Sequence, residues 1–205
     1  MNIEISEAPI ASVAELGLVP ISFTVDRVYD VLAPGHGPDG FVLCERAIEA
    51  PYLKDYDGIP GEGPAQCTRR YNLSNWGFIR AQSEARLTGG AVIAFDTRDV
   101  TMLEGRRDCA VVWDIRVSPD CRRKGVGSAL LTACEAWAGS KGCRQLKIET
   151  QNINVPACKL YERYGFVLRA IDRLAYPDLP GEIQLLWYKD LYRDSYSGLH
   201  LVGPR

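Results

Sequence analysis

The decisive stretch of this chain, residues 118–131, reads SPDCRRKGVGSALL. It follows an apolar, strand-like run at residues 111–117 (VVWDIRV) and opens a helical pattern that extends to about Ser140. Glycines at such a strand-to-helix junction let backbone N–H groups approach an anion without an intervening Cβ, and the helix N-terminus adds unpaired donors. Three consecutive cations stand in front of the glycines: Arg122, Arg123 and Lys124. The pattern predicts a pyrophosphate-binding loop.

Two other glycine-rich anion motifs do not fit this stretch. A P-loop requires Gly-x-x-x-x-Gly-Lys-Ser/Thr, which is absent, and a dinucleotide fingerprint requires Gly or Ala where this chain has Leu130. A surface turn that caps a helix would account for the glycines alone. It would not account for the preceding strand and the basic run, so the anion-binding interpretation is favoured.

A second motif occupies residues 146–166, LKIETQNINVPACKLYERYGF. It reads as a strand, a polar turn, a helix and a glycine stop before another strand. Asn154 suits the N-cap, Pro156 lies in the first turn where its missing N–H costs nothing, and Gly165 suits the position just after the helix. Tyr161 shares one helix face with apolar neighbours, so its spacing alone predicts a packed core aromatic.

Together, the two motifs resemble the signature of the GCN5-related N-acetyltransferase (GNAT) superfamily. The matching residues occur in the superfamily's order: Val117, Arg122, Gly125, Gly127, Asn154, Ala157, Tyr161, Gly165 and Phe166. The resemblance implies an α+β fold in which a mixed, mostly antiparallel, twisted sheet is flanked by helices. It also implies a single acetyltransferase domain over residues 1–205, with the core signature at about 75–190 and with N-terminal strands and a loop at 17–70.

The resemblance further implies acetyl-CoA as the acetyl donor. The residues expected to bind it are Ile115, Arg116, Val117, Arg122, Arg123, Lys124, Gly125, Val126, Gly127, Ser128, Asn154 and Ala157. Tyr161 matches the position that contacts the cofactor sulfur, and a phenol of pKa about 10 can donate to a departing thiolate of pKa about 8.5. The backbone N–H near Val117 is the implied donor to the oxyanion.

The acetyl acceptor must lose a proton before it attacks, because an alkyl amine with a pKa of about 10.4 is protonated at neutral pH. Asp114 and Glu149 are the two candidates for the proton acceptor, since each lies late on one of the two strands that splay apart in this fold. As a pair they would also hold an incoming ammonium by charge-assisted contacts. A carboxylate at a strand end is commonly just solvated, and the sequence does not decide which of the two is the base.

A narrower likeness is to the streptothricin acetyltransferases. It rests on residues 49–56 (EAPYLKDY), 113–115 (WDI), 149–152 (ETQN) and 186–188 (LWY). Where those proteins often carry a strongly acidic loop, this chain has a Gly/Pro loop at residues 57–64 (DGIPGEGP), which is expected to be mobile. Three further carboxylates are candidates for outer contacts to a cationic substrate: Glu45, Asp55 and Glu62.

The composition is that of an ordinary soluble globule, with 46% hydrophobic and 24% charged residues and a formal net charge of −2. No general surface for nucleic acid or membrane is expected from this balance. The seven cysteines are scattered without a Cys-x-x-Cys pair and are accompanied by only two histidines, so no metal set is visible and reduced thiols in the cytoplasm are expected. Neither a signal peptide nor a membrane-spanning run is recognised, and a homodimer is compatible with the sequence.

Apolar alternation and turn residues predict the order of the secondary structure. The expected strands are 17–32, 41–48, 75–82, 87–95, 110–118, 145–151, 166–173 and 183–190. The expected helices are 127–140 and 155–164, and a turn is expected at 34–40. Antiparallel strands followed by a strand–helix–strand–helix–strand order favour the α+β class.

The function implied is an acetyl-CoA-dependent N-acetyltransferase that acts on an amine of a small molecule, with streptothricin-type antibiotics, and hence antibiotic resistance, as the leading substrate hypothesis. One alternative is a protein or peptide N-acetyltransferase that modifies an N-terminus or a lysine. Another is a CoA-binding module without catalysis. The presence of Tyr161 and of both candidate carboxylates favours an active enzyme over the last alternative.

Overall fold

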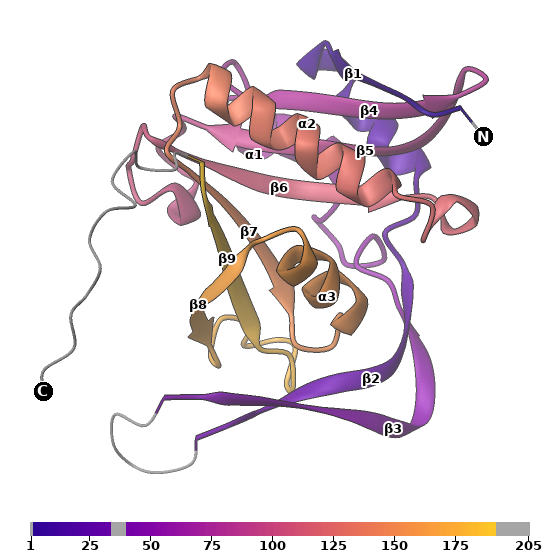
Figure 1. Ribbon diagram of the computed structural model, residues 1–205, viewed down its shortest axis with the longest axis vertical. Helices are drawn as coiled ribbons and strands as arrows, with labels where there is room; N and C mark the ends of the chain where they lie inside the picture. The colour runs from indigo at the N-terminus through magenta and orange to yellow at the C-terminus, as the bar shows by residue number, and fades with distance from the viewer. Residues whose placement is uncertain (1, 34–39, 192–205) are drawn as a thin grey trace, which may run out of the picture.

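The computed structural model of the chain describes residues 2–33 and 40–191. Its main sheet has seven strands in the spatial order β1-β4-β5-β6-β7-β9-β8 (Figure 1). In that order the strands are β1 (Glu4–Ala8), β4 (Gly77–Ser83), β5 (Arg86–Phe95), β6 (Cys109–Val117), β7 (Gln145–Gln151), β9 (Gln184–Asp190) and β8 (Val167–Asp172). Neighbouring strands are antiparallel except β6 and β7, which run parallel. The predicted α+β class with a mixed, mostly antiparallel sheet is confirmed.

Two helices cover one face of this sheet. Helix α2 (Val126–Ser140) crosses β4, β5 and β6, and α3 (Val155–Arg163) lies beside β7 and β8 (Figure 1). The core on this side includes Leu130 and Leu131 of α2 together with Ala91 and Ile93 of β5. No helix within residues 2–33 and 40–191 combines the length and the apolar character needed to cross a membrane.

The opposite face of the sheet is covered by shorter segments. These are the 3-10 helices η1 (Ile10–Leu18) and η2 (Thr101–Leu103) and the α-helix α1 (Pro64–Arg70). Leu16 of η1 packs there against Phe78 of β4 and Val92 of β5, all fully buried. A third 3-10 helix, η3 (Pro119–Cys121), links β6 to the loop before α2.

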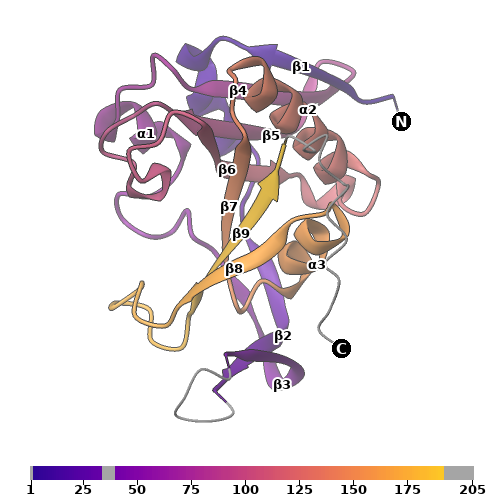
Figure 2. The ribbon, with the colours of Figure 1, turned by 60° about the vertical axis from the view of Figure 1, so that its left-hand side comes forward.

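A separate hairpin of β2 (Phe23–Leu32) and β3 (Val42–Lys54) extends away from the main sheet (Figures 1 and 2). Asn152, which directly follows β7, joins the hairpin to the sheet. Its Nδ2 donates to the Tyr29 carbonyl oxygen at 3.0 Å, while its Oδ1 accepts from the Ile183 N–H at 2.8 Å. One amide side chain thus connects β2, the end of β7 and the start of β9.

An opening forms where β6 and β7 separate. The two strands are paired only over Cys109–Val112 and Gln145–Ile148, whereas β6 follows β5 to Val117 and β7 follows β9 to Gln151. Trp113 is an extra residue in the β5–β6 register, and such a bulge bends the strand and increases its twist. Figure 1 shows the two strands starting side by side and diverging towards the end of β6. The gap leaves one edge of each strand without a strand partner.

The N-terminal third differs from the sequence expectations. The first predicted strand, 17–32, begins only at Phe23, because the preceding residues form η1. β3 runs to Lys54, beyond the predicted end at 48, since Tyr52 still pairs with Val25 of β2. β1 and α1 were not predicted, although Pro64 at the first position of α1 is a helix-start signal. The turn expected at 34–40 lies almost entirely outside the described residues.

Candidate active site

The two candidate carboxylates lie on the same face of the sheet, opposite α2 and α3. Asp114 is paired with Val92, a residue of the core under η1, whereas its neighbour Ile115 faces the core under α2. Glu149 follows Ile148, whose side chain is in the α2–α3 core, so Glu149 points to the other face. Asp114 and Glu149 therefore flank the opening from β6 and β7, as the resemblance implied.

The predicted anion loop lies at the N-terminus of α2. Gly125 is the N-cap with a left-handed φ of 85°, and Arg123 also has a positive φ, of 61°. The first bond of the helix runs from the Ala129 N–H to the Gly125 oxygen at 3.0 Å. The N–H groups of Val126, Gly127 and Ser128 make no backbone hydrogen bond within the described residues. These donors and the helix dipole fit a pyrophosphate.

Gly127 has a packing role that the sequence did not reveal. A Cβ built on it would lie 3.1 Å from Cδ2 of Leu160, so the missing side chain lets α3 approach α2 closely. The expectation that Gly127 also brings the backbone to a pyrophosphate stays a prediction. A bulky substitution at this position would disturb the packing of the two helices as well as the loop.

The basic run before the glycines is partly engaged with the protein itself. Arg122 donates from Nε to the Val117 oxygen at 3.0 Å and from Nη2 to the Ser22 oxygen at 2.8 Å. Lys124 donates to the Asp120 oxygen at 2.7 Å, whereas Arg123 is exposed and forms no ion pair with a described residue. Arg122 therefore fastens the end of β6 to the segment before β2, and its contact with a cofactor stays a prediction.

Asn154 and Ala157 share a local role at the start of α3. The Asn154 Oδ1 accepts from the Ala157 N–H at 3.2 Å, which is the expected N-cap bond. The capping prediction is confirmed, and a cofactor contact by these two residues stays a prediction. Cys158 in the next turn is buried, and burial raises the pKa of its thiol to about 12, so its interpretation as a packing residue is supported.

Arg116 is the electrostatic centre on the β6 side of the opening. Its side chain is 1% exposed and its Nε lies 3.0 and 2.9 Å from the two carboxylate oxygens of Asp114. Its Nη1 donates to Oδ2 of Asp57 at 2.7 Å. Burial raises the pKa of Asp114, and the Arg116 guanidinium opposes that rise. The guanidinium is thus committed to two carboxylates and to the Val19 oxygen, and the expected contact of Arg116 with a cofactor stays a prediction.

The segment 54–57, here called the strap, connects the two sides of the opening. Asp57 binds Arg116 on the β6 side, while Tyr56 donates to Oε2 of Glu182 at 2.6 Å beside β9. Lys54 also pairs with Glu182, and its ammonium lies 4.6 Å from the centre of the Tyr56 ring. The Gly/Pro loop expected to be mobile is therefore fixed at its start by an ion pair. Only the likeness at residues 49–56 pointed to this segment in the sequence.

Glu149 has neutral partners. Tyr176 donates to its Oε1, and Nε2 of Gln184 donates to its Oε2 at 2.9 Å. No Lys or Arg of the described ranges forms an ion pair with it. Burial raises the pKa of Glu149, and the two hydrogen bonds oppose that rise. Glu149 is thus a carboxylate without a bound cation, in contrast to Asp114.

Tyr161 approaches the opening from α3. It is 4% exposed, and its ring lies 6.0 Å from that of Phe166 and 6.3 Å from that of Trp187. The pKa of Tyr161 is raised, mainly by burial. Interactions with Cys158, Asp114 and Glu149 raise it further. Its hydroxyl therefore stays protonated at working pH and is within electrostatic reach of both carboxylates. The packing predicted from helical spacing is confirmed, and it is compatible with a proton-donor role.

The backbone of β6 supplies a donor at the opening. The Ser118 N–H donates to the Thr88 oxygen of β5 at 2.8 Å. Because hydrogen-bonded pairs alternate along an antiparallel ladder, the N–H of Val117 points away from β5. That direction is the side on which β7 has already diverged. The geometry agrees with the expected oxyanion donor near Val117.

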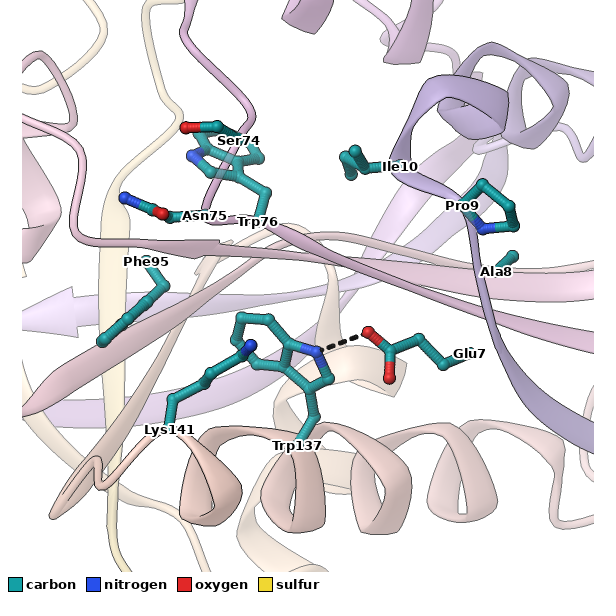
Figure 3. A pocket seen from close by; sticks show the side chains of 10 residues that line it. All are labelled: Glu7, Ala8, Pro9, Ile10, Ser74, Asn75, Trp76, Phe95, Trp137 and Lys141. Carbon is teal, nitrogen blue, oxygen red and sulfur yellow. Dashed lines mark hydrogen bonds between the residues drawn. The ribbon is translucent and has the colours of Figure 1, made fainter.

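A cavity of about 310 Å³ lies elsewhere, at the C-terminal end of α2 (Figure 3). Trp137 projects into it from α2 and donates from Nε1 to Glu7 of β1 at 2.9 Å, while Lys141 lies over the indole. Figure 3 shows Phe95 and Asn75 on the side of the cavity opposite Glu7. Because the anion loop is at the other end of α2, this cavity is separate from the candidate site.

Removing the guanidinium of Arg116 should test its role as the anchor of the site. Arg116→Met would leave the buried carboxylate of Asp114 unpaired, and the loss of one partner of a buried ion pair costs about 3–5 kcal/mol of unfolding free energy. Urea unfolding followed by circular dichroism measures the difference. Arg46→Met is the matched control, since the Arg46 side chain is 56% exposed in its pair with Asp30, and it should change stability far less. Equal losses in both variants would contradict the anchoring role.

The comparisons with known proteins agree with this geometry. The model of the acetyltransferase (GNAT) family matches residues 47–166. The chain is 32% identical to a streptothricin acetyltransferase of Escherichia coli over 170 residues, which cover 81% of this chain and 84% of that protein. It is 41% identical to streptothricin acetyltransferase A of Bacillus subtilis (strain 168) over 81 residues, or 38% of this chain and 47% of that protein, so this match spans under half of the relative's length. The crystal structure of nourseothricin acetyltransferase superposes with a TM-score of 0.74 at 26% identity and covers 94% of this chain and 100% of that chain.

Proposed function

The chain belongs to the acetyltransferase (GNAT) family, and on that premise we propose that it acetylates a cationic amine of a small molecule of the streptothricin class. Family membership makes it an N-acetyltransferase that uses acetyl-CoA. The observation that carries the proposal is the opening between β6 and β7. The unpaired N–H groups at the N-terminus of α2 lie on one side of it. The Asp114 and Glu149 carboxylates lie on the face of the sheet opposite α2.

We assign the base to Glu149 and not to Asp114. Burial raises the pKa of both carboxyl groups, but both oxygens of Asp114 already accept from the Arg116 guanidinium, which leaves them less open to the ammonium of an acceptor. Glu149 keeps its negative charge uncompensated, and its raised pKa brings it closer to working pH, where a general base is most effective. Glu149 would take the proton of the acceptor ammonium, after which the free amine attacks the thioester carbonyl carbon.

Two groups on the other side of the reacting centre would receive the developing charges. The Val117 N–H would donate to the carbonyl oxygen as it becomes an oxyanion, a contribution of about 3 kcal/mol when such a donor is preorganised. The Tyr161 hydroxyl would donate to the sulfur as the carbon–sulfur bond breaks. The proton that Glu149 removes leaves through solvent, and the second proton that the attacking nitrogen loses balances the one that the departing sulfur takes up. The products are the N-acetylated amine and the free thiol of CoA.

The charges around the opening support a cationic acceptor. Four carboxylates (Asp57, Asp114, Glu149 and Glu182) and two cations (Lys54 and Arg116) are gathered there by the strap, the two strands and the loop before β9. Four negative and two positive charges leave a formal charge of −2. The fold thus brings together the negative charge that the Gly/Pro loop lacks in sequence. Acetylation would remove the positive charge of the amine, which is how such an enzyme would confer resistance to a cationic antibiotic.

Thiol release from acetyl-CoA tests the proposed substrate class. With streptothricin, an aminoglycoside, spermidine and an alanine-terminated peptide as acceptors, kcat/KM should be highest for streptothricin, by about tenfold or more over the peptide, a gap of about 1.4 kcal/mol. The gap from the peptide is expected because the opening carries net negative charge and an alanine-terminated peptide offers only one ammonium. A preference for the peptide would instead support the protein N-acetyltransferase alternative. Binding of acetyl-CoA without thiol release for any acceptor would support the non-catalytic module.

We also propose a cytoplasmic location. No disulfide joins any of the cysteines in the described residues, and among them only Cys44 is exposed. Disulfides are rare where the cytosolic thiol systems keep cysteine reduced. A homodimer stays a prediction.

A further inference from the structure

The loop between β8 and β9, residues 173–183, reaches the opening through two side chains. Tyr176 donates to Oε1 of Glu149, and Glu182 accepts from Tyr56 of the strap at 2.6 Å. Neither contact is local in sequence, since 27 and 126 residues separate the partners. The sequence motifs did not include Tyr176, and none of the steps above uses it.

The donor and acceptor roles around Tyr176 are fixed by its second neighbour. Nε2 of Gln151 donates to the Tyr176 hydroxyl oxygen at 3.2 Å. Because a phenol carries one proton and an amide nitrogen only donates, the Tyr176 proton must be directed at Glu149. Gln184 holds the other carboxylate oxygen at 2.9 Å. Each oxygen of Glu149 therefore has one fixed neutral donor and keeps a free lone-pair direction for an incoming ammonium.

We infer that Tyr176 is a positioning residue for the base: its hydroxyl orients the Glu149 carboxylate towards the acceptor amine and favours the ionised form of that carboxylate. The inference rests on the proposed function, in which Glu149 is the base. A hydrogen bond donated to a carboxylate stabilises the charged form, and here it works against the desolvation of the buried group. Tyr176 thereby widens the pH range over which the base is able to accept a proton.

The strap explains why the Tyr176 loop can hold a fixed position. Glu182 is 9% exposed at its side chain and is held by the Lys54 ammonium and by the Tyr56 hydroxyl. The Tyr56 and Phe23 rings lie 6.3 Å apart, which adds packing at the base of the hairpin. The far end of the loop is therefore tied to the hairpin, and the loop carries Tyr176 to Glu149 as part of an anchored unit.

Several elements around the opening carry titratable and charged groups besides Glu149. They are Lys147 on its own strand, Asp114 and Arg116 on β6, Tyr161 on α3, Tyr176 and Glu182 on the β8–β9 loop, and Lys54, Tyr56 and Asp57 on the strap. Lys147 is paired with Glu104 and bonded to the Met102 oxygen, so its charge is compensated away from the opening. Among these groups Tyr176 contacts the carboxylate itself.

The pH dependence of kcat/KM tests the inference with the purified full-length enzyme, acetyl-CoA and spermidine as the acceptor. Tyr176→Phe removes one bond to the ionised carboxylate, so the pKa of Glu149 rises and the acidic limb of the profile should move to higher pH by about one unit. At pH values well above the acidic limb, kcat/KM should change by less than about threefold, because Glu149 is then ionised in both proteins. Tyr188→Phe is the matched control on β9, where the ring contacts Lys147 and Arg169 and the hydroxyl makes no hydrogen bond within the described residues.

The outcomes separate this inference from the proposed function. An unshifted limb in Tyr176→Phe, with a melting temperature equal to that of the parent, would overturn the positioning role while leaving the base assignment intact. A pH-independent fall in kcat would likewise overturn it, since that pattern indicates a structural role. Adding Tyr176→Phe to Glu149→Gln should not change the pH profile of kcat/KM further, because the carboxylate that Tyr176 acts on is already absent. Full activity of Glu149→Gln alone would overturn both the base assignment and the inference built on it.

Discussion

Replacing Glu149 by Gln is expected to lower kcat by about 10²–10⁴-fold, the usual contribution of a positioned general base. The substitution keeps the length of the side chain, and the Tyr176 hydroxyl can still donate to its carbonyl oxygen. It removes the one carboxylate at the opening that no cation compensates within the described residues. The loss should persist at saturating acceptor, because the missing step is proton removal and not binding. Steady-state thiol release over a range of acceptor concentrations measures it.

Asp114→Asn is the control that separates the two candidates. Both oxygens of Asp114 accept from Arg116, so its charge serves to anchor the site and the carboxylate is less open to the acceptor ammonium. The variant should keep kcat within about tenfold of the parent, and any loss should appear mainly in KM for a cationic acceptor. A larger fall in kcat for Asp114→Asn than for Glu149→Gln would reverse the assignment of the base. Unchanged acetyl-CoA affinity in both variants, measured by calorimetry, would show that the cofactor side is intact.

Local signals made part of this site predictable from the sequence. The helix start at Asn154 follows from capping rules that act within a few residues and is found as expected, while the helix expected at 127–140 begins one residue earlier, at Val126. The strands that carry Asp114 and Glu149 were recognised by apolar alternation next to those helix starts. The resemblance then supplied the divergence of the two strands, which the register confirms.

Other features of the site depend on contacts that are distant in the sequence. Arg116 meets Asp57 across 59 residues, so no spacing rule could show that its guanidinium faces carboxylates and not a cofactor. The same holds for Tyr176, which lies in a loop without periodicity. η1 was missed because residues 10–18 form 3-10 turns, for which the 3.6-residue pattern is a poor guide. Gly127 was read as an anion-loop glycine, and its contact with Leu160 emerges only once α2 and α3 are packed.

Replacing Tyr161 by Phe is expected to lower kcat by about 10- to 1,000-fold with little change in acetyl-CoA affinity. The ring keeps its contacts with Phe166 and Trp187, so the α3 packing survives. The change removes the buried hydroxyl proposed to donate to the departing sulfur. Burial raises the pKa of Tyr161 above its usual value, so the phenol is always protonated but is a weaker acid than the thiol it serves. Its contribution should therefore come from a hydrogen bond to the developing thiolate more than from complete proton transfer.

Two acyl donors and a second tyrosine make this prediction specific. Tyr164→Phe, at the C-cap of the same helix, loses only hydroxyl contacts of 3.0 Å to Thr132 and Glu135 and should retain full activity. If Tyr161 assists the leaving sulfur, its loss should also slow the reaction with an acyl donor whose thiol has the pKa of CoA more than with one whose thiol is more acidic, because a better leaving group needs less help. Equal losses with both donors would contradict a role of the Tyr161 hydroxyl at the departing sulfur. Full activity of Tyr161→Phe with acetyl-CoA would show that thiolate departure needs no donor at this position.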